Sequence, residues 1–260
     1  MDLILVALEG GVGTITLNNP VRRNCICDKL VSELVAAFDS LERDGARVVV
    51  LRSQPGSKVW SAGHDIHELP VHGRDPLDYE DSLETLLRKV QVFPLPVIAL
   101  VEGGVWGGAC DLIISCDIVV CSQDATFAIT PAKLGLPYNP SGLVHFIHTV
   151  GPHKAKEMLY TARPISADEA LGARLVNHKA ATAAAAEEQA YAIARAIADN
   201  APLAVKVLKR QFRMLLAGQM LPAEIFEMIQ GMRRTVYESE DYLEGILAFK
   251  EKRPPRFKGK

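Results

Sequence analysis

The sequence predicts an α/β fold, in which short buried strands alternate with helices, followed by a purely helical C-terminal region. The first observation behind this prediction is the alternation of β-rich runs and helical patterns along the first half of the chain. The second is that the pattern is helical only from about residue 180 onward. Because 260 residues suffice for one large core, we expect a core at residues 1–200 and a helical appendage at residues 201–260.

The first part of the chain is typical of two strands, a helix and a third strand. Strands are expected at residues 3–9 ("LILVALE"), 11–18 ("GVGTITLN") and 47–53 ("RVVVLRS"). A helix is expected over residues 28–43, with Asp28 placed to cap its start. The apolar positions of this segment recur at a period of 3.6 residues and so share one face. They are Leu30, Leu34, Phe38 and Leu41.

A second cycle of the same kind follows. Helices are expected near residues 79–92 and 107–115, and strands at residues 96–103 and 117–122. The strand "PVIALVEG" has no polar alternation, which is typical of a strand covered on both faces. Further along, residues 166–169 ("SADE") form a capping box that is expected to begin another helix.

The C-terminal part is expected to contain four helices. They are predicted over residues 180–199, from Pro202, over residues 222–239, and in a short segment that ends before Pro254. This part is rich in apolar side chains, which either form a core of their own or face another subunit. They are Met214, Leu215, Leu216, Met220, Leu221, Ile225, Phe226, Met228 and Ile229.

Charge and composition exclude several classes of function. The 29 basic and 31 acidic residues nearly balance, so no overall field attracts nucleic acid or an anionic membrane. The N-terminus lacks the basic segment and long apolar run of a signal or anchor, so a cytoplasmic protein is expected. The five cysteines are expected to be reduced structural thiols. Only the last eleven residues, with six cations and one acid, form a charged run, which is either a solvated tail or a clamp for a phosphate.

Two glycine-containing turns are the strongest candidates for chemistry. In "WSAGHDIHELP" Gly63 makes a sharp turn after a strand, and a short helix is expected near His64. In "VEGGVWGGACD" glycines again separate a strand from a helix. Backbone amides at such turns point outward, and two of them can hold a developing oxyanion. The alternative is that both are merely tight turns under a packed sheet.

Other kinds of site are not supported by these motifs. The glycines of the second turn lack dinucleotide-binding spacing, and Ala109 stands where a phosphate-binding loop needs lysine. No G-x-S-x-G motif is present. His64 and His67 have no third or fourth metal ligand near them in sequence, so no metal site is expected.

Several motifs in order along the chain carry a family resemblance. They are "LNNPVRRNCICDKLVSEL", "SAGHDI", "VEGGVWGGACDLIISCDIVV", "ATFAITPAKLGLP" and "ARPISADEALGARLVN". Together they resemble the crotonase (enoyl-CoA hydratase/isomerase) superfamily over almost the whole chain. The resemblance implies a spiral of repeated ββα units, a helical C-terminal trimerisation region, homotrimers or dimers of trimers, and an acyl-CoA thioester as substrate. It further implies that the amides of His64 and Gly108 form an oxyanion hole.

The resemblance also separates chemistries within the superfamily. Its hydratases use two glutamates, whose positions are occupied here by Asp111 and Pro131. The chain therefore lacks one of the two acids that hydration needs, because proline supplies none. Motifs including "TPAKLGLPYN" and "EKRPPRF" are instead similar to the decarboxylases of the superfamily, which implies a catalytic tyrosine at Tyr138. Those decarboxylases have glutamate where this chain has Asp111, whose role the sequence leaves open.

The expected reaction is the decarboxylation of methylmalonyl-CoA, or a close homologue, to propionyl-CoA and CO2, with no cofactor besides the CoA of the substrate. It requires an oxyanion hole and a C–CO2 bond held perpendicular to the thioester plane. An acid-free pocket is expected, because a nearby anion would repel the substrate carboxylate. Tyr138 is expected to orient that carboxylate and help to protonate the enolate. The alternatives are a hydratase or isomerase that uses Asp111, and a non-catalytic acyl-CoA-binding subunit.

Further residues are expected around the substrate. Thr130 offers a hydroxyl, although a turn role also suits a Thr-Pro pair. His64 has two possible roles: its amide as an oxyanion donor, which is preferred, and its imidazole as a contact to the carboxylate or a proton relay. Trp60 and Trp106 are expected to wall the acyl pocket or simply to pack. Lys252 corresponds by resemblance to a residue that contacts CoA. The other expected substrate-binding residues are Ala62, Gly63, Asp65 and Ile66.

Overall fold

The computed structural model describes residues 2–70, 75, 77–217 and 222–258, and contains two β-sheets. The larger sheet has the order β1-β2-β3-β5-β7-β10, and only its β1–β2 pair is antiparallel. Its strands are β1 (Ile4–Glu9), β2 (Val12–Leu17), β3 (Val48–Ser53), β5 (Val97–Val101), β7 (Ile118–Ser122) and β10 (His178–Ala180). The smaller sheet has the order β4-β6-β8-β9. Its strands are β4 (Val59–Ser61), β6 (Gly104–Trp106), β8 (Thr126–Ala128) and β9 (Ile165–Ser166).

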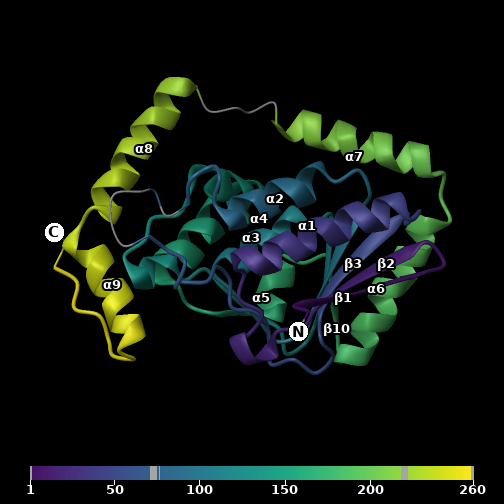
Figure 1. Ribbon diagram of the computed structural model, residues 1–260, viewed down its shortest axis with the longest axis horizontal. Coiled ribbons are helices and arrows are strands. Elements are labelled where there is room, and N and C mark those ends of the chain that lie inside the picture. The colour runs from purple at the N-terminus through teal and green to yellow at the C-terminus, as the bar shows by residue number, and fades with distance from the viewer. Residues whose placement is uncertain (1, 71–74, 76, 218–221, 259–260) are drawn as a thin grey trace.

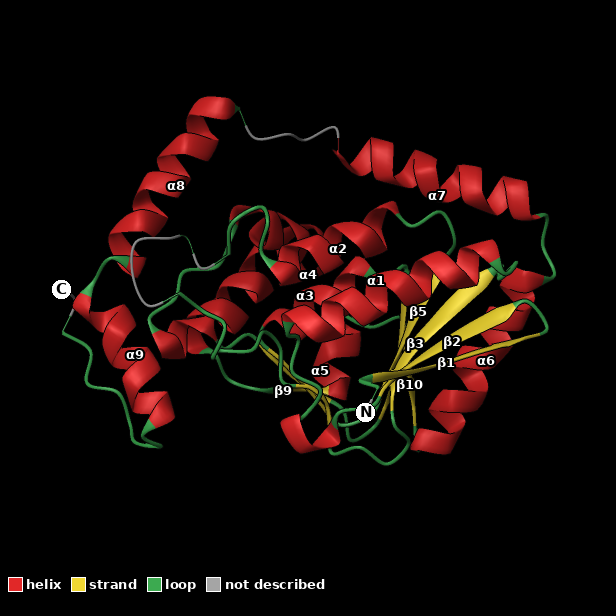
Figure 2. Cartoon of the chain, viewed as in Figure 1, coloured by secondary structure: helices red, strands yellow, loops and turns green. Residues whose placement is uncertain are grey.

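Successive coils of the chain place one strand in each sheet and then add a helix. β3 and β4 are followed by α2 (Ser82–Val92), and β5 and β6 by α3 (Gly108–Ser115). β7 and β8 are followed by α4 (Pro140–Thr161). The predicted spiral of ββα units is therefore confirmed (Figures 1 and 2).

Helices cover both faces of the larger sheet. On one face α1 (Asp28–Arg43), α2 and α3 pack over Ile15, Val49 and Ala99. On the other, α6 (Ala183–Ala198) packs over Val50, Ile98 and Val120 (Figure 1). The buried residues of α6 are all alanines, whose small side chains let the helix lie close to the strands. They are Ala186, Ala190, Ala194 and Ala198.

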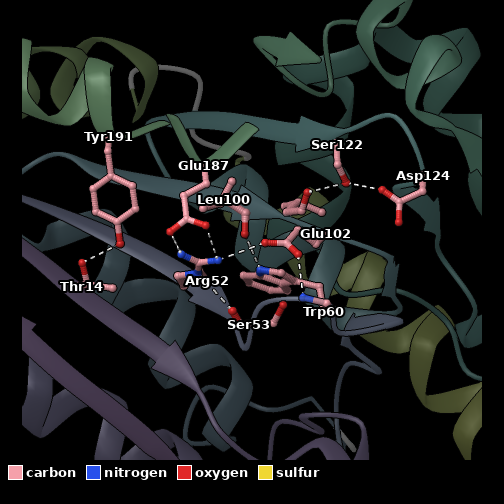
Figure 3. A network of polar contacts seen from close by, with 12 residues as sticks. Thr14, Arg52, Ser53, Trp60, Leu100, Glu102, Ser122, Asp124, Glu187 and Tyr191 are labelled. Carbon is pink, nitrogen blue, oxygen red and sulfur yellow. Dashed lines mark hydrogen bonds and ion pairs between the residues drawn. The ribbon is translucent and has the colours of Figure 1, made fainter. Parts of the chain in front are cut away.

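A buried ion-pair network ties α6 to the strand that leads into the second glycine turn. The Arg52 guanidinium lies 2.5 Å from Glu187 Oε1 and 3.1 Å from Glu102 Oε1, and both Arg52 and Glu102 are buried (Figure 3). The backbone N–H of Gly56 donates to the other Glu102 oxygen at 3.0 Å. Glu102 directly follows β5 and precedes Gly103 and Gly104, so the network fixes the start of the segment that leads to the second turn.

Replacing Arg52 with methionine is expected to lower the free energy of unfolding by about 3 to 5 kcal/mol, because Glu102 is left buried without its cation. Equilibrium urea unfolding measures this change. The matched control is Arg43→Met, since Arg43 pairs with Asp44 at an exposed site and such pairs contribute about 1 kcal/mol at most. Equal losses in the two variants would contradict a stabilising role for the buried pair.

The C-terminal helices are α7 (Pro202–Ala217), α8 (Ala223–Tyr237) and α9 (Glu240–Lys250). α7 and α8 lie at the outside of the molecule, away from the sheets (Figure 1). α9 instead packs on the 3-10 turn η2 (Pro131–Leu134), so closely that a Cβ on Gly245 would lie 2.2 Å from the Leu134 carbonyl oxygen. The last helix therefore supports the segment that follows β8. None of the helices described combines the length and apolar composition that a bilayer span requires.

Some predicted elements differ from the structure. No helix forms near His64, because this residue instead makes a β-bridge with Ile26. Asp28 is the first residue of α1 and not its cap; the N-cap is Cys27, whose side chain makes no capping hydrogen bond. The capping box of Ser166 and Glu169 is confirmed at the start of α5 (Ala167–Gly172). The sequence pattern did not predict α4, which is interrupted at Gly151, nor most of the short strands of the smaller sheet.

The five cysteines are buried and free, as expected of reduced thiols. Several side chains of the predicted apolar set on the C-terminal helices are exposed, including Met214, Leu215, Leu216 and Met228. Met220 and Leu221, counted in this set from the sequence, lie outside the described residues, as does the side chain of Ile225.

Candidate active site

A cavity of about 730 Å³ opens between the two glycine turns, α2 and the segment after β8. Its volume lies in the range of small-molecule sites. Most of the residues expected at the site from the sequence line it: Ala62, His64, Asp65, Ile66, Gly108, Thr130, Tyr138 and Lys252. Gly63, between Ala62 and His64 in the chain, is not among the lining residues. Sequence segments far apart in the chain thus meet around one space.

The two glycine turns are in direct contact with each other. A Cβ on Gly63 would lie 2.4 Å from the Trp106 carbonyl oxygen and 2.9 Å from the Gly108 nitrogen. Gly63 has a φ of +82° and Gly107 a φ of +55°, a region that favours glycine. The backbone N–H of His64 and that of Gly108, the first residue of α3, have no acceptor in the described part of the chain. Two unpaired donors therefore adjoin one cavity, as an oxyanion hole requires.

The imidazole of His64 is held by the protein on both sides. Its Nε2 lies 2.9 Å from Asp81 Oδ2, and its Nδ1 lies 3.0 Å from the backbone oxygen of Asp65. Burial alone would lower the pKa of His64, but the hydrogen bond and charge of Asp81 outweigh it and leave this pKa raised. Since both ring nitrogens have acceptors, the ring fixes the position of the turn. It is not placed as a free proton donor for a ligand.

Tyr138, just before α4, lines the cavity. Its ring packs edge-on against Phe146 with the centroids 5.8 Å apart, and Gly142 leaves room for it, since a Cβ there would lie 2.2 Å from Tyr138 Cε1. The hydroxyl oxygen lies 3.4 Å from Asp111 Oδ2. Burial, followed by the charge of Asp111, raises the pKa of Tyr138 well above its ordinary value. The phenol is therefore protonated at neutral pH.

The expectation of an acid-free pocket is wrong. The segment from Thr130 to Pro140 carries no acid, but Glu84 of α2 and Asp111 of α3 also line the cavity. Asp111 is buried and lies 3.0 Å from His145 Nδ1. Glu84 accepts hydrogen bonds from Asn139 and, at 3.4 Å, from Ser141. Burial, followed by the charge of Asp111, raises the pKa of Glu84 to about 7. The contact of Asp111 with His145 and the protonation of Glu84 therefore reduce the negative charge that these two carboxyl groups present to the cavity.

Replacing Glu84 with glutamine is expected to change how stability depends on pH. Between pH 4.5 and about 7 the folded protein keeps a proton on Glu84 that the unfolded chain releases, so this group's contribution to stability falls as pH rises. Glu84→Gln removes this pH dependence. The free energy of unfolding of the variant, taken relative to wild type, should therefore rise by about 3 kcal/mol between pH 4.5 and pH 8. Urea unfolding at both pH values measures the change. Glu188→Gln, at an exposed site on α6, should follow wild type, and so would Glu84→Gln if Glu84 were ionised throughout.

The sequence did not single out Glu84 or His145. A signal existed for Glu84, because it lies on the apolar face of α2 together with Leu83 and Leu87, where a solvated glutamate is not expected. His145 lies in the helix that the sequence pattern did not predict, so no neighbour in sequence linked it to Asp111.

The remaining predicted residues differ in their surroundings. Trp106 lines the cavity, but Trp60 is fully buried in the core and donates to the Leu100 oxygen at 2.8 Å, so its expected wall role is wrong (Figure 3). The Thr130 hydroxyl oxygen would lie 3.3 Å from a Cβ on Gly107 and so adjoins the second turn.

Lys252, after α9, reaches the cavity of its own chain. Arg22, Arg23 and Lys133 also line this cavity. Among the described residues, no group of three or more histidine, cysteine or acidic side chains could hold a metal ion.

Comparisons with known proteins agree with this geometry. Residues 7–260 match the family described as enoyl-CoA hydratase/isomerase. Over 248 residues the chain is 44% identical to the methylmalonyl-CoA decarboxylase of Escherichia coli K12, with 95% of each chain covered. It is 35% identical to a putative enoyl-CoA hydratase of Thermus thermophilus, covering 96% of this chain and 98% of the other. A solved structure of methylmalonyl-CoA decarboxylase in complex with 2-nitronate-propionyl-CoA superposes with a TM-score of 0.96 at 42% identity, over 99% of each chain.

Proposed function

The chain belongs to the enoyl-CoA hydratase/isomerase family, and we propose that within this family it is a carboxy-lyase that converts methylmalonyl-CoA, or a close homologue, to propionyl-CoA and CO2. The observation that carries the proposal is the composition of the wall opposite the two turns. By resemblance to the family, Pro131 stands where a hydratase has a glutamate, and Tyr138, whose phenol is protonated at neutral pH, lines the cavity near it. The 44% identity to a methylmalonyl-CoA decarboxylase supports the same assignment.

In the proposed mechanism the thioester oxygen lies between the backbone N–H groups of His64 and Gly108. Cleavage of the C–CO2 bond moves its electron pair into the thioester, and the two amides stabilise the enolate oxygen that forms. The thioester carbonyl itself accepts the electrons, so the reaction requires no cofactor beyond the CoA of the substrate. Tyr138 then donates its proton to the α-carbon. The cationic side chains at the cavity, Arg22, Arg23, Lys133 and Lys252, suit the phosphates of CoA.

Purified protein incubated with methylmalonyl-CoA and, separately, with crotonyl-CoA tests this proposal. Formation of propionyl-CoA and CO2 from the first is expected. Hydration of crotonyl-CoA without decarboxylation would instead favour a hydratase, an alternative that rests on Asp111 and Glu84 both lining the cavity. Inactivity toward both substrates together with tight binding of CoA would indicate a non-catalytic acyl-CoA-binding subunit.

We further propose a homotrimer or a dimer of trimers, working in the cytoplasm, with the region after residue 200 at the subunit contacts. Support comes from α7, whose large apolar side chains are exposed and follow the helix over its whole length. They are Leu203, Val207, Leu208, Phe212, Met214, Leu215 and Leu216, exposed by 52 to 78%. Side chains of this kind are more typical of an interface core than of a solvated helix.

Replacing Leu215 with glutamate is expected to shift the protein toward monomers, because the charge would be buried at the contact. Sedimentation velocity over a range of concentrations measures the distribution. Arg213→Glu, an exposed position on the same helix, adds the same carboxylate outside the apolar set and should keep the wild-type assembly. A wild-type protein that sediments as a monomer throughout would contradict the proposed oligomer.

A further inference from the structure

Three side chains connect the cavity to the surface of the protein. Tyr138 faces the cavity and its hydroxyl group lies 3.4 Å from Asp111 Oδ2. The other oxygen of Asp111, Oδ1, lies 3.0 Å from His145 Nδ1. The Asp111 side chain is 2% exposed, whereas that of His145 is 31% exposed. One carboxylate therefore bridges a buried phenol and a histidine that solvent reaches.

The proposed reaction gives such a connection a use. Loss of CO2 from a carboxylate consumes one proton per turnover, because the bond to CO2 is replaced by a C–H bond. If Tyr138 supplies this proton, its Oη–H bond breaks as the C–H bond forms, and a buried phenolate remains next to Asp111. That phenolate is a strong base, since burial and Asp111 disfavour its charge. It must be protonated again before the next turnover.

We propose, on the basis of the function proposed above, that Asp111 and His145 form the route by which this proton is replaced from solvent. The doubly protonated His145 ring passes its Nδ1 proton to Asp111 Oδ1, so this N–H bond breaks and the ring is left neutral. The carboxyl group then turns about its Cβ–Cγ bond and gives the proton to the Tyr138 oxygen. The His145 ring finally takes a proton from solvent, so the whole cycle moves one proton inward and returns each side chain to its starting state.

The surroundings of His145 suit this role. The groups that face its ring are Asp111 of α3, Glu84 and Gln91 of α2, with Gln91 Nε2 lying 3.3 Å from His145 Nε2. Burial lowers the pKa of His145, but the hydrogen bond and charge of Asp111 outweigh it, so this pKa is raised and the proton-loaded ring is favoured. Neither Asp111 nor His145 acts on the substrate in this route, so His145 is a positioning and relay residue.

The number of turnovers distinguishes this route from a structural role. In His145→Gln the glutamine amide can still donate to Asp111, but it is far too weak an acid to transfer a proton to it at neutral pH. With enzyme and methylmalonyl-CoA at comparable concentrations in a rapid-quench experiment, the first turnover should keep the wild-type rate, because Tyr138 starts protonated. Later turnovers should be slower by about tenfold or more. The result is a burst of one product per site, and added imidazole should restore the later turnovers.

Asp111→Asn should give the same burst, because an amide keeps the polar contacts but cannot carry the proton. The matched control is His153→Gln, at an exposed position on the same helix α4, which should show no burst. First and later turnovers slowed equally in both test variants, or not slowed in either, would overturn the route while leaving the decarboxylase proposal intact. Absence of CO2 release by the wild-type protein would overturn both.

Discussion

Replacing Tyr138 with phenylalanine is expected to lower kcat for methylmalonyl-CoA by about 10²- to 10³-fold, with a smaller change in KM. The variant keeps the ring that packs against Phe146 and fits beside Gly142, and loses only the hydroxyl group. That group is the proton donor of the proposed mechanism and contributes mainly after the substrate is bound, so the effect falls on kcat. Initial rates of propionyl-CoA formation over a range of substrate concentrations measure both constants.

Tyr160→Phe is the matched control for this variant. Tyr160 lies near the end of α4 with a 77% exposed side chain, and its loss of a hydroxyl group should leave both constants at their wild-type values. An unchanged kcat in Tyr138→Phe would remove the phenol from the chemistry and leave proton delivery to water in the cavity.

The second large effect is expected for Gly63→Ala, which should lower kcat by about 10²- to 10³-fold or more. The new methyl group would lie 2.4 Å from the Trp106 carbonyl oxygen and 2.9 Å from the Gly108 nitrogen. Both are backbone atoms, so the contact can be relieved only if the two turns move apart. The His64 and Gly108 amides then no longer converge on one oxygen atom. Rates with methylmalonyl-CoA, together with an unfolding curve that confirms a folded variant, test this expectation.

Gly45→Ala separates this displacement from backbone strain. Gly45 has a φ of +89°, close to that of Gly63, but a Cβ there would meet no atom within 4 Å. The control should therefore lose about 1 to 2 kcal/mol of stability and keep its kcat. A Gly63→Ala protein with wild-type activity would show that contact between the turns is not needed for the chemistry.

The elements predicted well from the sequence are those whose local pattern is strong. The strands around Val49 and Ile98 are runs of branched apolar residues, and both are confirmed as buried strands. The strands of the smaller sheet have three residues or fewer, some of them glycine, and so carry little pattern. In α4 the helical pattern is broken at Gly151 and Pro152, which hid the helix.

In the candidate site, too, residues with a strong local pattern were predictable and residues brought together by packing were not. The two glycine turns were predictable, because glycines that follow a strand pattern indicate a turn whose amides point outward, and Gly63 and Gly107 do have a positive φ. Glu84 was not, since it meets Asp111 and Tyr138 only through the packing of α2 and α3 against the start of α4.

The contact between Gly63 and the second turn has a consequence for refolding. The two amide donors belong to successive coils of the spiral, one after β4 and the other after β6, and neither coil alone contains both. The anion-binding geometry therefore exists only once the two coils have stacked in their final register. Regain of catalytic activity after dilution from denaturant should follow the recovery of helical signal and never precede it, which makes turnover a reporter of completed coil stacking.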